Sequence, residues 1–347
     1  MFSIAQYPTY QVFLGIVLSL VGCAVLFPFW IKLLRFRNIG QQVRADGPQG
    51  HLVKQGTPTM GGVLILIVVF AVYVAMGDFG RLSLLALGAM AACGILGFFD
   101  DWSKVAHERS LGLTPRAKIA GQAFVALAFG LLVVNWGGIS TEVALPLLPV
   151  VIDLGIYTSM IEFGTYALAV PWLYLAFVFV MVVGESNAVN LTDGLDGLAA
   201  GTVTIVMLAY AGIAFRQNRL DVALLAASVA GACIGFLWYN SYPADIFMGD
   251  TGSLGLGAGI AALAIVTKTE LLLLLIGGIY LAETLSVVLQ VASFKLTGKR
   301  IFRMAPIHHH FEMVGWSETK IMVRFWIVTG IMAGAGFALY FVGSVRN

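Results

Sequence analysis

Two groups of aspartates have the types and spacing of residues that hold a metal ion beside a phosphate group. Asp100 and Asp101 are adjacent and directly follow an apolar run. Two carboxylates at the C-terminal end of a helix oppose the helix dipole, so helix stability alone does not select them there. Asp250 lies between glycines at the start of another apolar run, where it could bind a ligand or cap the helix. Carboxylates in these positions suit a Mg²⁺-dependent reaction on a phosphorylated substrate, with Asp100, Asp101 and Asp250 as candidate catalytic residues.

A third polar segment repeats amides and carboxylates at every third position, at Asn187, Asn190, Asp193 and Asp196. In a helix, steps of three would spread these side chains over about half of the circumference. The interspersed glycines favour a turn that leads into the next apolar run, and they allow a ligand to approach the backbone. Either arrangement brings two amides and two carboxylates together. The segment lacks the ligand spacing and closing Glu of an EF-hand, so a substrate site is the better interpretation.

Two further residues have side chains suited to a nucleotide. Lys54 precedes a segment rich in Gly and Pro, where free backbone N–H groups and an ammonium could bind an anion. Phe247 is the aromatic residue beside Asp250, and it could stack a nucleobase. The simpler alternatives are a solvated turn with a lysine at the lipid headgroups, and an aromatic residue at the membrane interface.

Three consecutive histidines, His308, His309 and His310, form the last unusual feature. In an extended segment the first and third would point one way and the second the other, which suits a zinc site poorly. We therefore expect them to donate hydrogen bonds to phosphate or sugar oxygens. Gln290 and Glu283 lie inside an apolar run, where polar side chains normally face protein or a cavity.

These residues are embedded in a chain that has the composition of a membrane protein. Its 347 residues are 59% hydrophobic and 11% charged, with a mean hydropathy of +0.92. So few charges cannot cover a water-facing surface, which excludes a soluble enzyme, and a net charge of +2 gives no case for nucleic-acid binding. The three cysteines lie in apolar runs and predict no disulfide framework.

The apolar runs are continuous and too long for the alternating segments of a membrane β-barrel, so we predict an all-α polytopic fold. A span needs about 20 mostly apolar residues. Ten candidate spans follow, in one membrane domain covering residues 1–347: 12–34, 61–76, 82–99, 119–136, 167–184, 198–215, 222–239, 253–267, 270–292 and 324–343.

The distribution of Lys and Arg predicts the orientation of these spans. All but five of the 20 Lys and Arg residues (Arg81, Arg216, Arg219, Lys268 and Arg346) lie in one alternate set of loops. That set is predicted to be cytoplasmic, which leaves both termini in the periplasm. The segment 137–166, between two spans on the outer side, has β-branched runs broken by prolines and is predicted to form a small hairpin. The five cytoplasmic loops are 32–60, 100–118, 185–197, 240–252 and 293–324.

Four sequence blocks resemble a known family, the polyprenyl-phosphate sugar-1-phosphate transferases. The blocks 100–104, 187–198 and 247–253 are similar to the wider family. The block Pro306-Ile-His-His-His-Phe-Glu312 is similar to its phospho-N-acetylmuramoyl-pentapeptide-transferase branch. The resemblance extends over all ten spans and every inner loop in order.

The resemblance implies a reaction at the inner membrane of bacteria, catalysed by a homodimer. Undecaprenyl phosphate would attack the β-phosphate of UDP-N-acetylmuramoyl-pentapeptide, giving lipid I and UMP, with Mg²⁺ required. By resemblance, Asp250 is the Mg²⁺ ligand, Asp100 and Asp101 are catalytic, and Phe247 lies against the uracil. The resemblance assigns the rest of the cleft to Lys54, Lys104, Asn187, Asp193, Gly194, Leu195, Asp196, Asn240, Gln290, Ala305, His308 and His309. Asn190 and His310 join these candidates through the sequence patterns described above.

Two other functions fit part of this pattern. A transferase of N-acetylhexosamine-1-phosphate onto the same lipid would share the acidic blocks but not the triple histidine. An ion-coupled transporter would also carry intramembrane carboxylates and broken helices. It predicts symmetric halves and charges near mid-membrane, whereas these carboxylates gather at one face and no internal repeat is visible.

Overall fold

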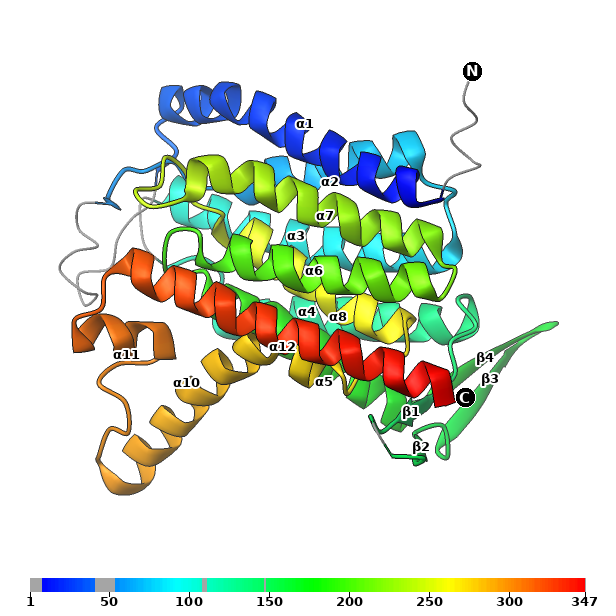
Figure 1. The fold of residues 1–347 in the computed structure, drawn as a ribbon. Helices are drawn as coiled ribbons and strands as arrows, with labels where there is room; N and C mark the ends of the chain where they lie inside the picture. Colours follow the sequence, from blue (N-terminus) through cyan, green and yellow to red (C-terminus); the bar gives the residue numbers. More distant parts are fainter. Residues whose placement is uncertain (1–7, 41–53, 108–110, 147, 347) are drawn as a thin grey trace, which may run out of the picture.

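Long helices account for most of the computed structural model, which describes residues 8–40, 54–107, 111–146 and 148–346 (Figure 1). The helices are α1 (Pro8–Phe36), α2 (Gly61–Met76), α3 (Arg81–Ala106), α4 (Pro115–Asn135), α5 (Trp172–Thr192), α6 (Leu198–Arg216), α7 (Leu220–Asn240), α8 (Gly249–Val266), α9 (Leu273–Ile276), α10 (Gly278–Thr297), α11 (Ile307–Val314) and α12 (Glu318–Arg346). Four short strands lie between α4 and α5: β1 (Glu142–Ala144), β2 (Val151–Asp153), β3 (Thr158–Phe163) and β4 (Tyr166–Pro171).

Most of these helices have the length and composition of membrane spans. Among the described residues, nine are long and apolar enough to cross a bilayer, and α2 is apolar but has 16 residues. Nine of the ten predicted spans correspond to one helix each, and the remaining one, 270–292, covers α9 and most of α10. The prediction of a polytopic, all-helical membrane fold is therefore confirmed.

Helix α8 forms the centre of the bundle. Every residue from Thr251 to Val266 is buried, and α3 and α5 pack along the helix (Figure 1). Glycines permit this close packing at the N-terminal end of α8. A Cβ on Gly62 would lie 2.1 Å from the backbone nitrogen of Gly252, and one on Gly97 would lie 2.2 Å from the carbonyl oxygen of Asp250. The first turn of α8 is thus held directly against α2 and α3.

The connection between α4 and α5 is more ordered than the sequence predicts. It contains two antiparallel hairpins, β1 with β2 and β3 with β4, which reach Pro171 instead of ending near residue 166. The predicted start of the fifth span at residue 167 is therefore wrong. Residues 166–171 pair with β3, so α5 begins at Trp172. Hydrophobicity alone does not separate an apolar strand from the helix that follows it.

The predicted ninth span, 270–292, also differs from the structure. It is divided into α9 and α10, which meet at Gly277 and Gly278, and α10 swings away from the bundle (Figure 1). A glycine pair is a common cause of a helix break. In addition, α3 continues to Ala106 and α5 to Thr192, past their predicted ends at 99 and 184. Hydrophobicity marks the apolar part of a span, whereas the backbone hydrogen bonds continue into the polar residues that follow.

Candidate active site

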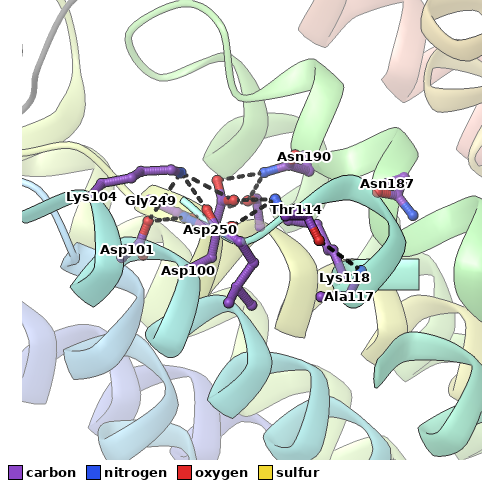
Figure 2. A network of polar contacts seen from close by, with 12 residues as sticks. Asp100, Asp101, Lys104, Thr114, Ala117, Lys118, Asn187, Asn190, Gly249 and Asp250 are labelled. Atoms are coloured by element: carbon purple, nitrogen blue, oxygen red, sulfur yellow. Dashed lines mark hydrogen bonds and ion pairs between the residues drawn. The ribbon is translucent and has the colours of Figure 1, made fainter. Parts of the chain in front are cut away.

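Three carboxylates from two helices meet at the N-terminal end of α8 (Figure 2). Asp100 and Asp101 are buried in the last turns of α3, and the half-buried Asp250 lies in the first turn of α8. Each offers one oxygen within 4.8 Å of the others, an arrangement that could hold a metal ion. Residues about 150 positions apart in the sequence are joined here because α3 and α8 pack side by side.

Two lysines neutralise part of this negative charge. The Nζ of Lys104 lies 2.6 Å from Oδ2 of Asp100 and 3.2 Å from Oδ2 of Asp250. The Nζ of Lys118 lies 2.6 Å from Oδ2 of Asp250 and 3.4 Å from Oδ1 of Asp100. Three carboxylates and two ammonium groups leave a formal charge of −1, which a divalent cation would reverse.

Lys118 was not predicted as a site residue from the sequence, where it appeared only as one of the basic residues that indicate the orientation of the spans in the membrane. Lys118 lies in the first turn of α4, three residues after Pro115. A positive charge there opposes the helix dipole, as the paired aspartates do at the end of α3. That unfavourable position is the signal that could have identified Lys118 as functional.

Asp101 holds the start of α8 in place. Its Oδ1 accepts a hydrogen bond from the backbone N–H of Asp250 at 3.0 Å, and its Oδ2 accepts from the backbone N–H and hydroxyl of Thr251 at 2.9 and 2.8 Å. A carboxylate from α3 thus caps the N-terminus of α8, a favourable interaction with both the free N–H groups and the dipole. The carboxylate of Asp250 makes no such cap and is directed toward the lysines and Asn190, which donates to its Oδ1 at 2.9 Å.

Asp100 is enclosed by the segment that leads into α4. Its Oδ1 accepts a hydrogen bond from the backbone N–H of Leu113 at 2.8 Å. Gly112 packs against the same carboxylate, since a Cβ at that position would lie 2.5 Å from Oδ1. The carboxylate is therefore held by backbone together with Lys104 and Lys118.

The two amides predicted to lie in a turn are instead on the last turns of α5. Asn190 donates to Asp250 and to the hydroxyl of Ser253 at 2.8 Å. Asn187 donates to Oε1 of Gln122 at 2.9 Å, and Gln122 donates to the hydroxyl of Ser186 at 2.8 Å. Gln122 is fully buried on α4, one turn after Lys118, and sequence analysis did not single it out.

Asp193 ends α5 and lies near the carboxylate cluster without joining its hydrogen bonds. Among the described residues, its carboxylate has no hydrogen-bond partner. Burial, and then the negative charges of Asp250 and Asp101, raise the pKa of Asp193 well above its ordinary value. An acidic group left in this state is available to a ligand that brings positive charge or hydrogen-bond donors.

The turn from Asp193 to Gly197 is fixed by side chains from distant segments. Oδ1 of Asp196 accepts from Nζ of Lys54 at 2.7 Å, and its Oδ2 accepts from the backbone N–H of Ala244 at 3.0 Å. Asn240 accepts from the backbone N–H of Gly197 at 3.0 Å, and Leu195 is buried beneath the turn. Burial lowers the pKa of Lys54, but its hydrogen bonds to Asp196 and Glu318 outweigh this and raise the pKa above the ordinary value.

Phe247 connects the Lys54 segment to the start of α8. Its backbone N–H donates to the carbonyl of Pro58 at 2.8 Å, and its carbonyl accepts from the N–H of Gly61 at 2.9 Å. The side chain is half-buried. These backbone bonds fix the segment that carries Phe247 against the loop between Lys54 and α2.

The three histidines lie on a helix, α11, and not in an extended segment. His308 is fully buried, with Nδ1 3.0 Å from Oε1 of Glu283 and Nε2 against Gly194, where a Cβ would lie 2.4 Å away. Nδ1 of His309 lies 2.5 Å from Oε2 of Glu312. The ring centroids of His308 and His309 lie 4.1 Å apart, and His308 contacts the 193–197 turn through Gly194.

Two further residues predicted to line the site, Gln290 and Ala305, contact or belong to the loop between α10 and α11. The amide of Gln290 donates to the carbonyl of Phe302 at 2.9 Å and accepts from the N–H groups of Ile301 and Phe302 at 3.0 and 2.9 Å. Ala305 is half-buried just before α11, and Nδ1 of His310 accepts from the N–H of Arg303 at 3.1 Å. In this state, the backbone occupies both polar atoms of Gln290.

Comparison with known proteins agrees with this geometry. Residues 83–268 match the family model described as glycosyl transferase family 4, and residues 54–66 match signature 1 of phospho-N-acetylmuramoyl-pentapeptide-transferase. Among similar proteins, the phospho-N-acetylmuramoyl-pentapeptide-transferase of Halalkalibacterium halodurans is 49% identical over 91% of this chain and 93% of its own. Those of Shouchella clausii and Frankia alni are each 46% identical, covering 92% and 94% of this chain and 95% of their own. The carboxylates, Lys104, Lys118 and the 193–197 turn lie within the matched regions, and the chain belongs to the phospho-N-acetylmuramoyl-pentapeptide-transferase family.

Proposed function

We propose that this protein transfers phospho-N-acetylmuramoyl-pentapeptide from its UDP conjugate to undecaprenyl phosphate, releasing UMP and forming lipid I for peptidoglycan synthesis. The observation that carries the proposal is the partly buried cluster of three carboxylates and two lysines at the end of a central membrane helix. The names of the relatives, which match over more than nine-tenths of the chain, support the choice of substrates. The whole chain would act as a single membrane domain.

The cluster fits Mg²⁺. Carboxylate oxygens are the ligands this ion uses beside phosphate groups, and three of them lie within 4.8 Å of one another. Asp250 and Asp100 would hold the ion. Both oxygens of Asp101 are tied to backbone N–H groups of α8, whereas the oxygens of Asp250 accept from side chains, which can move aside. When bound, Mg²⁺ supplies positive charge that stabilises the diphosphate of the donor as charge moves onto UMP.

The chain's own residues would mainly position and neutralise the reacting groups. Lys104 and Lys118, which both contact Oδ2 of Asp250, can donate to phosphate oxygens, and Asn190 keeps Asp250 oriented. Asp101 keeps the first turn of α8 in register with α3. This division of labour is typical of phosphoryl transfer, in which little covalent chemistry is left to the protein.

Asp100 is proposed to act electrostatically and not as a covalent nucleophile. A phosphate monoester has a second pKa of about 6, so the lipid phosphate is largely dianionic at pH 7 and already nucleophilic. Asp100 is also bound by Lys104, Lys118 and the N–H of Leu113, which leaves its carboxylate constrained. Exchange of labelled UMP into the donor, in enzyme freed of lipid, would refute this part of the proposal.

The donor would occupy the loops around the 193–197 turn. Phe247 is proposed to stack on the uracil, with Lys54 and Asp196 nearby. The remaining cleft residues would contact the sugar and diphosphate: Asn187, Asp193, Gly194, Leu195, Asn240, Gln290, Ala305, His308, His309 and His310. For Gln290, binding the donor would require release of its bonds to the 301–302 backbone.

We further propose that the site faces the cytoplasm of a bacterial inner membrane and that the protein functions as a homodimer. The concentration of Lys and Arg in the loops around the site supports the orientation. A cysteine introduced at position 299 should not be labelled by an impermeant thiol reagent added outside intact cells. The three native cysteines are buried and should not react either. Ready labelling from outside would reverse the orientation.

A donor-competition assay tests the substrate assignment. Purified enzyme with undecaprenyl phosphate and Mg²⁺ should transfer label from UDP-N-acetylmuramoyl-pentapeptide into the lipid phase. A tenfold excess of UDP-N-acetylglucosamine should change the rate by less than about twofold. Transfer from UDP-N-acetylglucosamine, with none from the muramoyl donor, would instead identify an N-acetylhexosamine-1-phosphate transferase.

A further inference from the structure

One carboxylate outside every motif described above ties the 193–197 turn to the last helix. Glu318 is the first residue of α12. Its Oε1 accepts hydrogen bonds from Nζ of Lys54 and from the backbone N–H of Asp196, the latter at 3.0 Å. These partners are 264 and 122 residues away in the sequence.

Glu318 and Asp196 together restrain the ammonium of Lys54. The side chain of Lys54 is 16% exposed, and those of Asp196 and Glu318 are 3% and 12% exposed. A lysine side chain is flexible and loses rotamer entropy when it is fixed. Two carboxylates that hold it before the substrate arrives remove that cost from substrate binding.

Capping of the α12 N-terminus does not explain the contacts that Glu318 makes. An acidic residue in the first turn of a helix interacts well with the helix dipole. Here, however, Ser317 supplies the local capping, because its carbonyl and hydroxyl accept from the backbone N–H groups of Ile321 and Lys320 at 3.0 and 3.3 Å. Oε1 of Glu318 is instead bonded to groups of two other segments.

The same turn is supported on its other side by α11, where His308 packs against Gly194. Trp326 of α12 adds a hydrogen bond from its indole to the carbonyl of Gly197 at 3.2 Å. The turn is therefore clamped between α11 and α12. Within this clamp, Glu318 is the residue that contacts both the backbone of the turn and the lysine of the first loop.

We propose that Glu318 is a positioning residue for the sugar-nucleotide donor. It fixes Lys54 and the 193–197 turn relative to each other, so that the donor meets a preformed surface. This inference rests on the proposed function, because it assumes that these loops bind the donor. It predicts that loss of Glu318 weakens binding of the donor. Binding of the lipid acceptor and the rate of the chemical step should change little.

Steady-state kinetics of Glu318→Gln test the proposal. This variant keeps the size and the hydrogen-bonding oxygen but removes the charge, and charge-assisted bonds are roughly twice as strong as neutral ones. We expect the donor KM and the inhibition constant of UMP to rise about tenfold, or roughly 1.4 kcal/mol. The KM for undecaprenyl phosphate and kcat should stay within about twofold. Glu162→Gln, at an exposed carboxylate on β3, is the matched control.

A double-mutant cycle separates positioning from a general loss of structure. In a Lys54→Met background, adding Glu318→Gln should raise the donor KM by less than about threefold, because the lysine to be positioned is gone. An equal tenfold effect in both backgrounds, or a fall in kcat with an unchanged donor KM, would overturn the proposal. If Glu318→Gln fails to fold, Glu318→Asp provides the same readouts.

The cycle also distinguishes this inference from the proposed function. Wild-type enzyme that transfers nothing from the muramoyl donor would refute the proposed function. Wild-type enzyme that transfers normally, beside a Glu318→Gln variant with the same donor KM and UMP inhibition, would refute the role of Glu318 alone.

Discussion

The two ends of α8 are both rich in charged and polar side chains, yet they are built differently. At the N-terminal end, Asp100, Asp101 and Asp250 crowd together with Lys104 and Lys118, and a fourth carboxylate, Asp193, lies close by. Four carboxyl groups face two ammonium groups. Such an arrangement is costly for the protein alone, so it indicates a site that awaits a cation.

At the C-terminal end of α8, every charge has an evident partner. Nζ of Lys268 lies 2.7 Å from Oε1 of Glu270 and donates to the carbonyls of Ser140 and Glu142 at 3.0 and 2.5 Å. Arg219 donates to the carbonyl of Val266, the last residue of the helix. Cations placed on the last carbonyls of a helix complement its dipole.

Under the proposed function, one end of α8 carries a polar cluster that serves catalysis and the other end carries one that serves stability. The C-terminal cluster pairs opposite charges and satisfies backbone carbonyls. The N-terminal cluster places like charges together and positive charge at the start of α4. Substitutions at the two ends should therefore separate activity from stability.

The largest effect should follow from Asp250→Asn. The variant keeps the shape and the bond to Asn190 but removes the central charge, so transfer should fall by at least about 100-fold. The melting temperature without Mg²⁺ should fall by no more than a few degrees, because the loss of the ion pairs with Lys104 and Lys118 is partly offset by relief of repulsion among the aspartates. Radiolabelled transfer and thermal unfolding on the same preparation check both. Near-normal transfer with the usual need for Mg²⁺ would assign the ion elsewhere.

A smaller loss is expected for Lys118→Gln, the residue that sequence analysis missed. Removal of its ammonium from Oδ2 of Asp250 should lower kcat/KM about 10- to 100-fold, since one charged contact to a phosphate is lost. Arg116→Gln, at an exposed residue of the same helix turn, is the matched control for the change of charge. Equal activity of the two variants would show that Lys118 only neutralises the resting site.

The contrast between Lys118 and the aspartates also shows what the sequence could predict. Apolar runs located the spans, and the carboxylates and amides between them marked the loops that are proposed to bind substrate, because both signals are local. The joining of Asp100 to Asp250, the cap from Asp101 and the bond from Glu318 to Lys54 depend on how distant helices pack. A single glutamate at the start of α12 has an ordinary local explanation, so its contact across 264 residues left no trace in the sequence pattern.

Lys268→Met should show the opposite pattern from the site variants. It leaves Glu270, buried at 1% exposure, without its partner and frees two carbonyls. We expect a loss of roughly 1–3 kcal/mol in the free energy of unfolding. Transfer per folded molecule should stay within about twofold of wild type. A large fall in kcat without a change in melting temperature would remove the distinction between the two ends.

The smallest effect concerns the pH dependence of stability at Asp193. Because burial raises the pKa of this carboxyl in the folded protein, its contribution favours folding at low pH and is lost as the pH rises through the raised pKa. Without Mg²⁺, the melting temperature of Asp193→Asn minus that of wild type should therefore increase as the pH rises from about 4 to 8. A difference that stays constant over this range would show that Asp193 is not perturbed.

Metal binding by variants at both ends of α8 tests most directly whether the N-terminal end of this helix is the metal site. Mn²⁺ reports by electron paramagnetic resonance and commonly substitutes for Mg²⁺ at carboxylate sites. Wild type and Lys268→Met should each bind one Mn²⁺ per chain in competition with Mg²⁺, and Asp250→Asn should lose this binding. Equal Mn²⁺ binding by Asp250→Asn and wild type would contradict the assignment of the N-terminal end of α8 as the metal-dependent site.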